Sequence, residues 1–376
     1  MSGTSLDGLD LALCKVKGSG VDTQLELLAF ETVEYSASFR DNIRSVFSKA
    51  EVDMKKLCIM NAEIGIEHAH LVNNLLNRWS IDPSDVDLIA SHGQTVFHAP
   101  QGLSAGKEHP NSTLQIGDGD HISVHTGIIT ISDFRQKHVA AGGEGAPLVI
   151  YGDYLLFNHP VESRVMLNIG GISNFTFLPA GGETAGIFAT DVGPGNTLMN
   201  QYMQAHFSRS YDKDGELALA GEVNNNLLNT LLDHPFFEQH LPKSTGPELF
   251  NLSFLALAQK KSGTEDISAS DIMATLCQFT AVVIADNVLS LAADYPNLTV
   301  YISGGGYNNP LLMRQLQAAL GDVQLANTSV LGMNPDAKEA AIFSVLANET
   351  IAGTPLSFPK LSGAPAVCFG KISFPD

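Results

Sequence analysis

Apolar and polar residues follow a pattern that changes from strand to helix and back along the first part of the chain. Alternation with a period of two predicts a strand, and apolar residues at helical spacing predict a helix. On this basis the first part of the chain is predicted to form a two-stranded ribbon, then a helical block that ends at Pro83, and then short buried strands. The predicted strands cover residues 10–16, 24–35, 86–90 and 127–132, and the helical block runs from 36 to about 81.

The second part of the chain repeats this order of elements. A ribbon comes first, a Gly170-Gly171 turn joins its strands, and further strands alternate with helical segments, which indicates an α/β fold. The predicted strands cover residues 164–169, 174–178, 186–190 and 298–302, and the helical segments cover 199–207, 223–232, 272–291 and 337–350.

The repeated order predicts two similar domains, at residues 1–140 and 141–350, with 351–376 returning to the first domain. The helix-like run at 337–350 is a candidate to carry the chain back. A chain of 376 residues, 44% of them hydrophobic, is long enough to bury a core in each domain.

Charge and composition exclude several classes of partner. The chain carries 21 Lys and Arg against 40 Asp and Glu, a formal net charge of −19, and it lacks the basic stripe that a nucleic acid requires. The apolar run at 282–293 is interrupted by Asp286 and Asn287 and is shorter than the ~20 residues of a membrane-spanning helix. Four widely separated cysteines fit a reducing compartment. We therefore expect a soluble cytoplasmic protein that binds neither nucleic acid nor membrane.

Three glycine-rich turns are the first candidates for chemistry. They are Gly3-Thr4-Ser5-Leu6-Asp7-Gly8, Gly170-Gly171 and Gly304-Gly305-Gly306, and each adjoins a predicted strand. Glycine lets backbone N–H groups approach phosphate oxygens, and the hydroxyls of the first turn add donors. A tight hairpin turn explains any one of them. Three such turns, each beside a predicted strand and in this order along the chain, favour a nucleotide held between two domains.

Acidic residues near these turns suggest a general base and a metal site. Asp191 precedes the rigid turn Gly193-Pro194-Gly195 at the end of a predicted strand, where a carboxylate faces a cleft. An N-cap or Asx-turn residue is the structural alternative. Asp7 and Asp10 are candidates to hold Mg²⁺ through water, although Asp7 can equally stabilise its own turn.

Polar residues after two other predicted strands suggest a site for an anionic substrate. His92 and Gln94 follow one strand, and Arg135 and Lys137 follow the next. Basic side chains in a very acidic protein are what an anionic substrate needs. A surface salt bridge, which contributes little to stability, is the plainer explanation.

Short segments along the chain carry a family resemblance. They are Met1-Ser-Gly-Thr-Ser-Leu-Asp-Gly-Leu-Asp10, Ser91-His-Gly-Gln-Thr95, Leu114-Gln-Ile-Gly-Asp-Gly119, Asp133-Phe-Arg135, Ala140-Ala-Gly-Gly-Glu-Gly-Ala-Pro-Leu148, Leu167-Asn-Ile-Gly-Gly-Ile-Ser-Asn174, Asp191-Val-Gly-Pro-Gly-Asn196 and Ser303-Gly-Gly-Gly306. In this order and density they closely resemble the anhydro-N-acetylmuramic acid kinases over nearly the whole chain.

The resemblance implies two RNase H-like domains of the sugar kinase, Hsp70 and actin type, with ATP and Mg²⁺ in the interdomain cleft. It also implies that water opens the ring of 1,6-anhydro-N-acetylmuramic acid at C1 while O6 takes the γ-phosphoryl group. The products are N-acetylmuramate 6-phosphate and ADP, and the process is cell-wall recycling. Whether the protein forms a homodimer is left open.

The resemblance further implies roles for particular residues. Asp191 is expected to be the base that activates water, and Glu339 to contact the sugar, together with His92, Gln94 and Arg135. Asp7 is the metal candidate. The expected nucleotide contacts are Gly3, Thr4, Ser5, Leu6, Asp7, Gly8, Leu9, Asp10, Gly170, Gly171, Gly304, Gly305 and Gly306.

The sequence also departs from the family. The family's first strand, an apolar run that leads into Gly3, is missing here, which implies the loss of a central strand and weak ATP binding or low stability. Val192 stands where many members have Thr, and His138 where many have an acidic residue. Either change is expected to retune contacts to the nucleotide or the sugar.

Two other functions remain open at this point. One is a different sugar or acyl kinase on the same scaffold, in which Asp191 deprotonates a free hydroxyl. The other is an actin-like binding module that is switched by nucleotide without small-molecule turnover. The polar residues at the strand ends argue against the binding module, and solvent oxygen at C1 of the product separates the two kinases.

Overall fold

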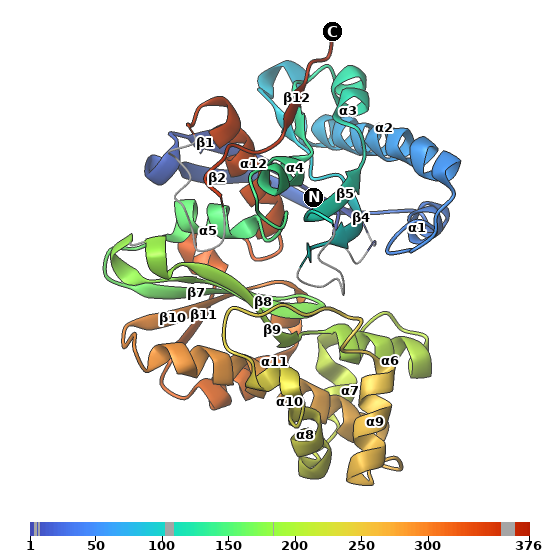
Figure 1. Ribbon diagram of the computed structural model, residues 1–376, viewed down its shortest axis with the longest axis vertical. Helices are drawn as coiled ribbons and strands as arrows, with labels where there is room; N and C mark the ends of the chain where they lie inside the picture. The colour runs from blue at the N-terminus through green and yellow to red at the C-terminus, as the bar shows by residue number, and fades with distance from the viewer. Residues whose placement is uncertain (4–5, 7, 102–108, 183, 355–364) are drawn as a thin grey trace. The chain divides into compact units, whose positions relative to one another are not determined.

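The chain divides into two compact units. The structure, a computed structural model, describes all residues except 4–5, 7, 102–108, 183 and 355–364 (Figure 1). Unit 1 contains Met1–Leu156 and Ala337–Asp376, and unit 2 contains Phe157–Asp336. The expected boundaries at 140 and 350 therefore differ from the observed ones.

The boundaries differ because two helices, one from each side of unit 2 in the sequence, pack together inside unit 1. These helices are α5 (Val149–Phe157) and α12 (Lys338–Ile351). Gly152 of α5 lies so close to Ile342 of α12 that an added Cβ would come within 2.5 Å of it. The buried Lys338 ammonium also lies 2.8 Å from the buried Asp153 carboxylate. Short-range pattern in the sequence does not reveal such a pairing.

In its described residues, unit 1 contains three small sheets (Figure 1). Two are antiparallel pairs, β1–β2 and β4–β5, and the third has the order β12-β6-β3 with β3 and β6 parallel. The strands are β1 (Gly8–Lys17), β2 (Gln24–Glu34), β3 (Ile89–Ala90), β4 (Gln94–Ala99), β5 (Ser112–Ile116), β6 (Thr130–Ser132) and β12 (Lys371–Ser373). The other helices are α1 (Ala37–Arg44), α2 (Met54–Trp79), α3 (Gly119–Thr126) and α4 (Phe134–Ala140).

The predicted helical block of unit 1 consists of two helices, because an aspartate starts the second one. The Asp53 carboxylate accepts the backbone N–H of Lys55 at 2.8 Å and of Lys56 at 3.3 Å, which caps α2 at its first turn. Helix α2 then runs to Trp79, and Ser80 ends it in the left-handed conformation with φ of 57°.

Unit 2 is built on one five-stranded mixed sheet with the order β11-β10-β7-β8-β9 (Figure 1). Strand β7 is parallel to β10 and antiparallel to β8, and β8 is also antiparallel to β9. The strands are β7 (Ser163–Ile169), β8 (Ile172–Leu178), β9 (Phe188–Pro194), β10 (Leu298–Ser303) and β11 (Gln324–Asn327). The helices are α6 (Thr197–Phe207), α7 (Glu216–Leu219), α8 (Asn225–Leu232), α9 (Leu252–Ser262), α10 (Ala269–Ala292) and α11 (Pro310–Leu320).

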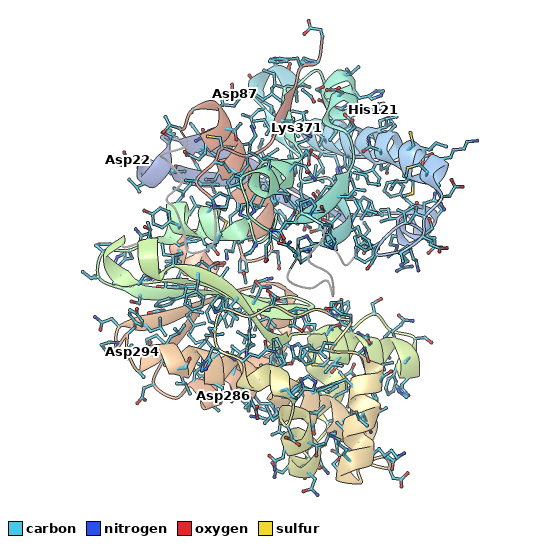
Figure 2. All side chains as sticks on the ribbon, in the orientation of Figure 1. Asp22, Asp87, His121, Asp286, Asp294 and Lys371 are labelled. Carbon is cyan, nitrogen blue, oxygen red and sulfur yellow. The ribbon has the colours of Figure 1, made fainter. Side chains whose placement is uncertain are left out.

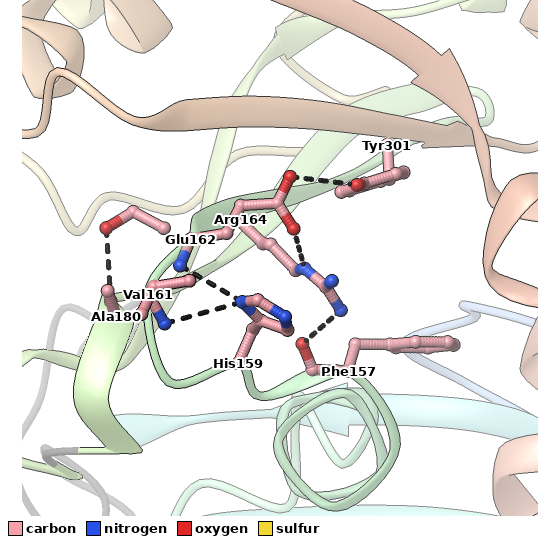
Figure 3. Close-up of polar contacts among 8 residues, drawn as sticks. Phe157, His159, Val161, Glu162, Arg164, Ala180 and Tyr301 are labelled. Atoms are coloured by element: carbon pink, nitrogen blue, oxygen red, sulfur yellow. Dashed lines mark hydrogen bonds and ion pairs between the residues drawn. The ribbon is translucent and has the colours of Figure 1, made fainter.

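A polar cluster holds the amino end of β7 beside β10 (Figure 3). Arg164 donates from Nε to Glu162 Oε2 at 2.6 Å and from Nη1 to the Phe157 carbonyl at 2.9 Å. Tyr301 on β10 donates its hydroxyl to Glu162 Oε1 at 3.0 Å, and the Arg164 guanidinium lies 5.3 Å from the Tyr301 ring centroid. These contacts support the register that brings the carboxyl ends of the two strands together.

Helix α10 is a core helix of unit 2. Of the helices in the described part of the chain, it is the one whose length and composition would allow it to cross a membrane, and 72% of its most apolar window is buried inside the protein. Asp286 lies on its exposed side (Figure 2). The apolar run is therefore longer than the expected 282–293, and packing against the sheet explains its composition.

Candidate functional site

In unit 1, Arg135 is held in place by two acceptors from other segments. Its Nε donates to His92 Nε2 at 3.0 Å, and its Nη1 donates to the Gly145 carbonyl at 2.8 Å. His92 Nδ1 lies 2.9 Å from the Gly93 carbonyl, which accepts only if Nδ1 carries the proton. His92 is therefore the neutral tautomer whose free lone pair faces Arg135.

The electrostatics of this cluster agree with that tautomer. Burial lowers the pKa of His92 well below its ordinary value, and the Arg135 guanidinium lowers it further. Glu339, in the first turn of α12, has a pKa that desolvation raises and that the attraction of Arg135 lowers. The structure thus couples His92, Arg135 and Glu339 electrostatically, and the hydrogen bond makes His92 a support for Arg135.

His138 supports the same guanidinium from the other side. It is buried, and its Nδ1 accepts the backbone N–H of Gly145 at 2.9 Å, while the Gly145 carbonyl accepts from Arg135. Burial, followed by the charge of Arg135, lowers the pKa of His138 to about 4. His138 is therefore a neutral acceptor near pH 7. It holds Gly145 through the backbone N–H, and the Gly145 carbonyl in turn holds Arg135.

Loss of this acceptor is expected to weaken the binding of an anionic substrate by Arg135, with little change in turnover. In His138→Ala the Gly145 N–H loses its acceptor, and the Gly145 carbonyl that accepts from Arg135 is no longer fixed. We therefore expect KM for that substrate to rise about tenfold, which corresponds to roughly 1.4 kcal/mol. Steady-state kinetics on folded protein measure this. His138→Asn, which keeps an acceptor, should recover most of the loss. A fall in kcat at constant KM would contradict the positioning role.

Gln94 does not face open space, which corrects the expectation of a direct sugar contact. Its side chain is fully buried, its Oε1 accepts the Ser2 hydroxyl at 2.6 Å, and its Nε2 donates to the carbonyls of Gly3 at 3.3 Å and Thr95 at 3.2 Å. The amide is thus occupied in holding the amino-terminal turn. Thr4, Ser5 and Asp7 of that turn lie outside the described residues.

The described residues after this turn have structural roles. Leu6 and Leu9 are buried in the core of unit 1, so neither side chain is placed to contact a nucleotide as expected. Gly8 has no room for a side chain, because an added Cβ would lie 2.5 Å from the Val33 carbonyl oxygen. The Asp10 carboxylate accepts the Thr32 hydroxyl at 2.6 Å. No group of three or more metal-ligating side chains occurs among the described residues.

In unit 2, the two other glycine turns follow neighbouring parallel strands, β7 and β10. An added Cβ at Gly171 or Gly305 would meet nothing within 4 Å. At Gly304 it would lie 2.4 Å from Asn168 Oδ1, and at Gly306 it would lie 2.2 Å from Ile169. Gly304 and Gly306 are therefore required for packing, whereas Gly171 and Gly305 present open backbone.

The first of these turns is also tied to the start of α6. The Gly170 carbonyl accepts the N–H of Asn196 at 2.8 Å, and the Gly171 carbonyl accepts the N–H of Thr197 at 3.0 Å. These two hydrogen bonds fix the Gly170-Gly171 turn against the first residues of α6. Backbone N–H groups at a helix start and in glycine turns suit phosphate oxygens.

Asp191 lies on β9 with one carboxylate oxygen fixed. Its Oδ2 accepts the backbone N–H of Thr245 at 2.9 Å, and its own N–H donates to the Lys243 carbonyl at 2.9 Å. Desolvation raises the pKa of Asp191 to about 6, the Thr245 N–H opposes this, and the negative charge of Glu248 adds to it. A half-buried carboxylate with this pKa is suited to accept a proton near neutral pH.

The segment that holds Asp191 was missed in the sequence. Lys243, Thr245 and Glu248 come from a loop more than fifty positions further along the chain. Its one local signal is the Gly246-Pro247 pair between polar residues, which resembles the Gly-Pro turn after Asp191. Gly145 acts only through its backbone N–H and carbonyl, so its residue type gave no comparable indication in the sequence.

The α/β fold in two units, with a glycine turn after each of two neighbouring parallel strands, fits the two-domain sugar kinase class. Within that class, the family model described as anhydro-N-acetylmuramic acid kinase matches residues 1–375. The chain belongs to this family.

Curated relatives carry the same description. The anhydro-N-acetylmuramic acid kinase of Pseudoalteromonas atlantica is 50% identical over 379 residues, which cover 100% of this chain and 94% of the relative. That of Caldanaerobacter subterraneus subsp. tengcongensis is 41% identical over 99% of this chain and 95% of the relative. Among solved structures, the activator of the 2-hydroxyisocaproyl-CoA dehydratase from Clostridium difficile with bound ADPNP matches with a TM-score of 0.36 and 14% identity, over 63% of this chain and 84% of that one.

Proposed function

We propose that this protein uses ATP to open 1,6-anhydro-N-acetylmuramic acid with water and to phosphorylate O6, which yields N-acetylmuramate 6-phosphate and ADP. The family match over residues 1–375 carries the proposal. The reaction belongs to cell-wall recycling, and its place is the cytoplasm.

The chemistry needs one base and one phosphoryl acceptor. The bicyclic sugar has no free 6-hydroxyl, so water attacks C1 and loses a proton to the base while the C1–O6 bond breaks. The O6 electron pair then forms the bond to the γ-phosphorus as the bond from that phosphorus to the β-phosphate bridging oxygen breaks. ADP leaves, and the base returns its proton to solvent.

Asp191 is the group best suited to be that base. The Thr245 N–H fixes one of its oxygens, and its pKa of about 6 keeps it mostly ionised at pH 7 while leaving it basic enough to accept a proton. An Asx-turn residue would use its carboxylate within its own turn, whereas this one accepts from a distant loop. That difference supports the catalytic role.

The open backbone of Gly171 and Gly305 is suited to cradle the phosphates of ATP. Phosphoryl transfer depends on positioning and on neutralising charge, which fixed N–H groups provide. Mg²⁺ would neutralise further charge on the triphosphate, and it keeps several of its waters when bound. Asp7 remains the proposed water-mediated contact to the ion, and the described residues offer no cluster that would hold it without the triphosphate.

Arg135 and Glu339 are the proposed sugar contacts. Two of the five guanidinium N–H groups are occupied by His92 and Gly145, and the planar fork matches a carboxylate such as the lactyl group of the sugar. His92 and Gln94 are positioning residues in this proposal, the first for Arg135 and the second for the amino-terminal turn.

The test is a coupled ADP assay with the anhydro sugar in H₂¹⁸O. We expect sugar-dependent ADP release and one ¹⁸O at C1 of the product, because only ring opening places solvent oxygen there. ADP release without ¹⁸O would favour a kinase acting on a free hydroxyl. ATP hydrolysis that the sugar does not stimulate would favour a nucleotide-switched binding module.

A further inference from the structure

Four buried polar side chains lie in a row in the core of unit 1. They are Ser2, Tyr35, His68 and Gln94, with exposed fractions of 1%, 3%, 3% and 0%. Four segments supply them: the amino-terminal residues, the residue after β2, helix α2 and the first position of β4. Buried polar groups are costly without hydrogen-bond partners, so the members of this polar row depend on one another.

Hydrogen bonds join the members of the polar row one after another. His68 Nε2 lies 2.8 Å from the Tyr35 hydroxyl, and the Tyr35 hydroxyl donates to Ser2 Oγ at 3.1 Å. Ser2 Oγ donates to Gln94 Oε1 at 2.6 Å, and Gln94 Nε2 donates to the Gly3 carbonyl at 3.3 Å. The polar row therefore ends on the backbone of Gly3, the first residue of the first glycine-rich turn.

Each hydrogen bond in the polar row has one possible direction. Gln94 Nε2 donates to two backbone carbonyls, so Gln94 Oε1 faces Ser2 and must accept. Ser2 has one hydroxyl proton and gives it to Gln94, so Ser2 Oγ accepts from Tyr35. Tyr35 has no second proton, and its oxygen accepts from His68 Nε2. Burial lowers the pKa of His68 to about 3, so His68 is the neutral tautomer with its proton on Nε2.

The end of the polar row sets the direction of the Gly3 carbonyl. Carbonyl oxygens repel phosphate oxygens, so a turn that binds phosphate through backbone N–H groups needs its carbonyls directed elsewhere. The Gln94 amide is fully buried, and it holds the Gly3 carbonyl toward the interior of unit 1. Because buried hydrogen bonds strengthen one another, loss of one member weakens the hold at the end of the polar row.

Stability alone does not explain the polar row. Tyr35 packs in a cluster that is otherwise apolar and includes Leu6, Leu9 and Ile64. Replacing both partners of a buried hydrogen bond by apolar groups of the same shape is nearly neutral for stability. What the polar row supplies, and apolar side chains cannot, is a donor aimed at the Gly3 carbonyl.

We propose that His68 and Tyr35 are positioning residues for ATP, because the polar row that they begin holds the Gly3 carbonyl away from the phosphates. Both side chains are buried, so neither contacts the nucleotide itself. The inference rests on the proposed function, since it takes the turn that begins at Gly3 to be a nucleotide contact. Variants that break the polar row should weaken ATP binding and leave the proposed base unaffected.

The first test is Tyr35→Phe, which removes the hydroxyl and keeps the ring that packs against Phe39. We expect Kd for ATP, measured by calorimetry, and KM for ATP to rise about tenfold, with kcat changed less than about twofold. The matched control, Tyr151→Phe, removes a hydroxyl of unit 1 that donates to the Pro365 carbonyl at 2.7 Å, and it should leave ATP binding unchanged. Unchanged ATP affinity in Tyr35→Phe, or an equal loss in both variants, overturns the proposal.

Two variants of His68 separate the hydrogen bond from packing. In His68→Gln the side-chain amide can still donate to the Tyr35 hydroxyl, so we expect Kd for ATP within about twofold of that of the natural protein. His68→Leu has no donor and should lose as much ATP affinity as Tyr35→Phe. Thermal unfolding shows that each variant is folded. A loss in His68→Gln as large as that in His68→Leu would overturn the proposal.

A double variant tests whether the members act as one row. Gln94→Met removes the donor to the Gly3 carbonyl, so adding Tyr35→Phe to it should weaken ATP binding no further. Losses that add in full would contradict the polar row. Calorimetry with ATP alone needs no sugar, so this inference can fail while sugar-dependent turnover is normal. Conversely, ATP binding without sugar-dependent ADP release would count against the proposed function and not against the polar row.

Discussion

Asp191→Asn is expected to lower turnover by about 10²- to 10⁴-fold while ATP binding is retained. The amide keeps the size of the side chain and an acceptor for the Thr245 N–H, but it cannot take a proton from water. The coupled ADP assay measures turnover, and calorimetry measures ATP binding. Near-normal turnover in this variant would refute the role of Asp191.

The pH dependence of the same residue gives an independent check. The base must be ionised, so kcat/KM of the natural protein should fall as pH drops through about 6, and the residual activity of Asp191→Asn should not show this fall. The folded pKa lies above the ordinary value of 3.8, so ionisation costs stability. That cost is absent below about pH 4 and complete above about pH 6.

Asp191→Asn should therefore be more stable than the natural protein at pH 8, by at most about 3 kcal/mol and less after solvent screening. The gain should disappear below pH 4. Asp294→Asn, at an exposed position just after α10, serves as the control and should change neither turnover nor stability appreciably. Equal stability of Asp191→Asn and the natural protein at pH 8 would contradict the raised pKa.

Asp153→Ala is expected to have the largest effect on stability, a loss of about 3 to 5 kcal/mol. The side chains of Asp153 and Lys338 are 1% and 5% exposed and lie 2.8 Å apart, so removal of the carboxylate leaves a buried ammonium without its counterion. The pair joins α5 to α12, where the chain returns to unit 1. Chemical denaturation monitored by circular dichroism measures the loss.

Two controls separate this effect from a general sensitivity to charge removal. The double variant Asp153→Leu with Lys338→Met removes both charges and should recover most of the stability. Asp133→Asn breaks a pair with Lys371, whose side chain is 67% exposed, and should cost less than about 1 kcal/mol. A loss below 1 kcal/mol in Asp153→Ala would show that the pair does not hold the two helices together.

Several elements could be predicted from local pattern because their causes are local. The ribbon expected at 10–16 and 24–35 is observed at Gly8–Lys17 and Gln24–Glu34, where alternation of side chains matches the two faces of the hairpin. The helical block expected from 36 to about 81 is observed as the two helices α1 and α2, and the division between them was not predicted because the Asp53 cap was not recognised. The domain boundaries were displaced because α5 and α12 pair through contacts between residues nearly two hundred positions apart.

The residues of the candidate site also separate into those that local sequence pattern indicated and those that it did not. Asp191 and the glycine turns could be proposed from the sequence because each adjoins a predicted strand, and they stay predictions. Gln94, Leu6 and Leu9 were assigned to ligands, although burial turns their side chains inward. Thr245, Gly145 and the supporting role of His138 were missed because each acts through a backbone group or a contact with a distant segment.

By itself the sequence determined the alternating elements, the net negative charge and the family, and it singled out Asp191 as a candidate base, because each depends on residue type or on spacing within one element. Only the tertiary structure decided which groups Arg135 and Asp191 contact, which glycines present open backbone, and which buried side chains form the polar row that ends at Gly3. Hydrogen bonds and burial between distant segments set these features, and their energies depend on geometry that residue order does not express.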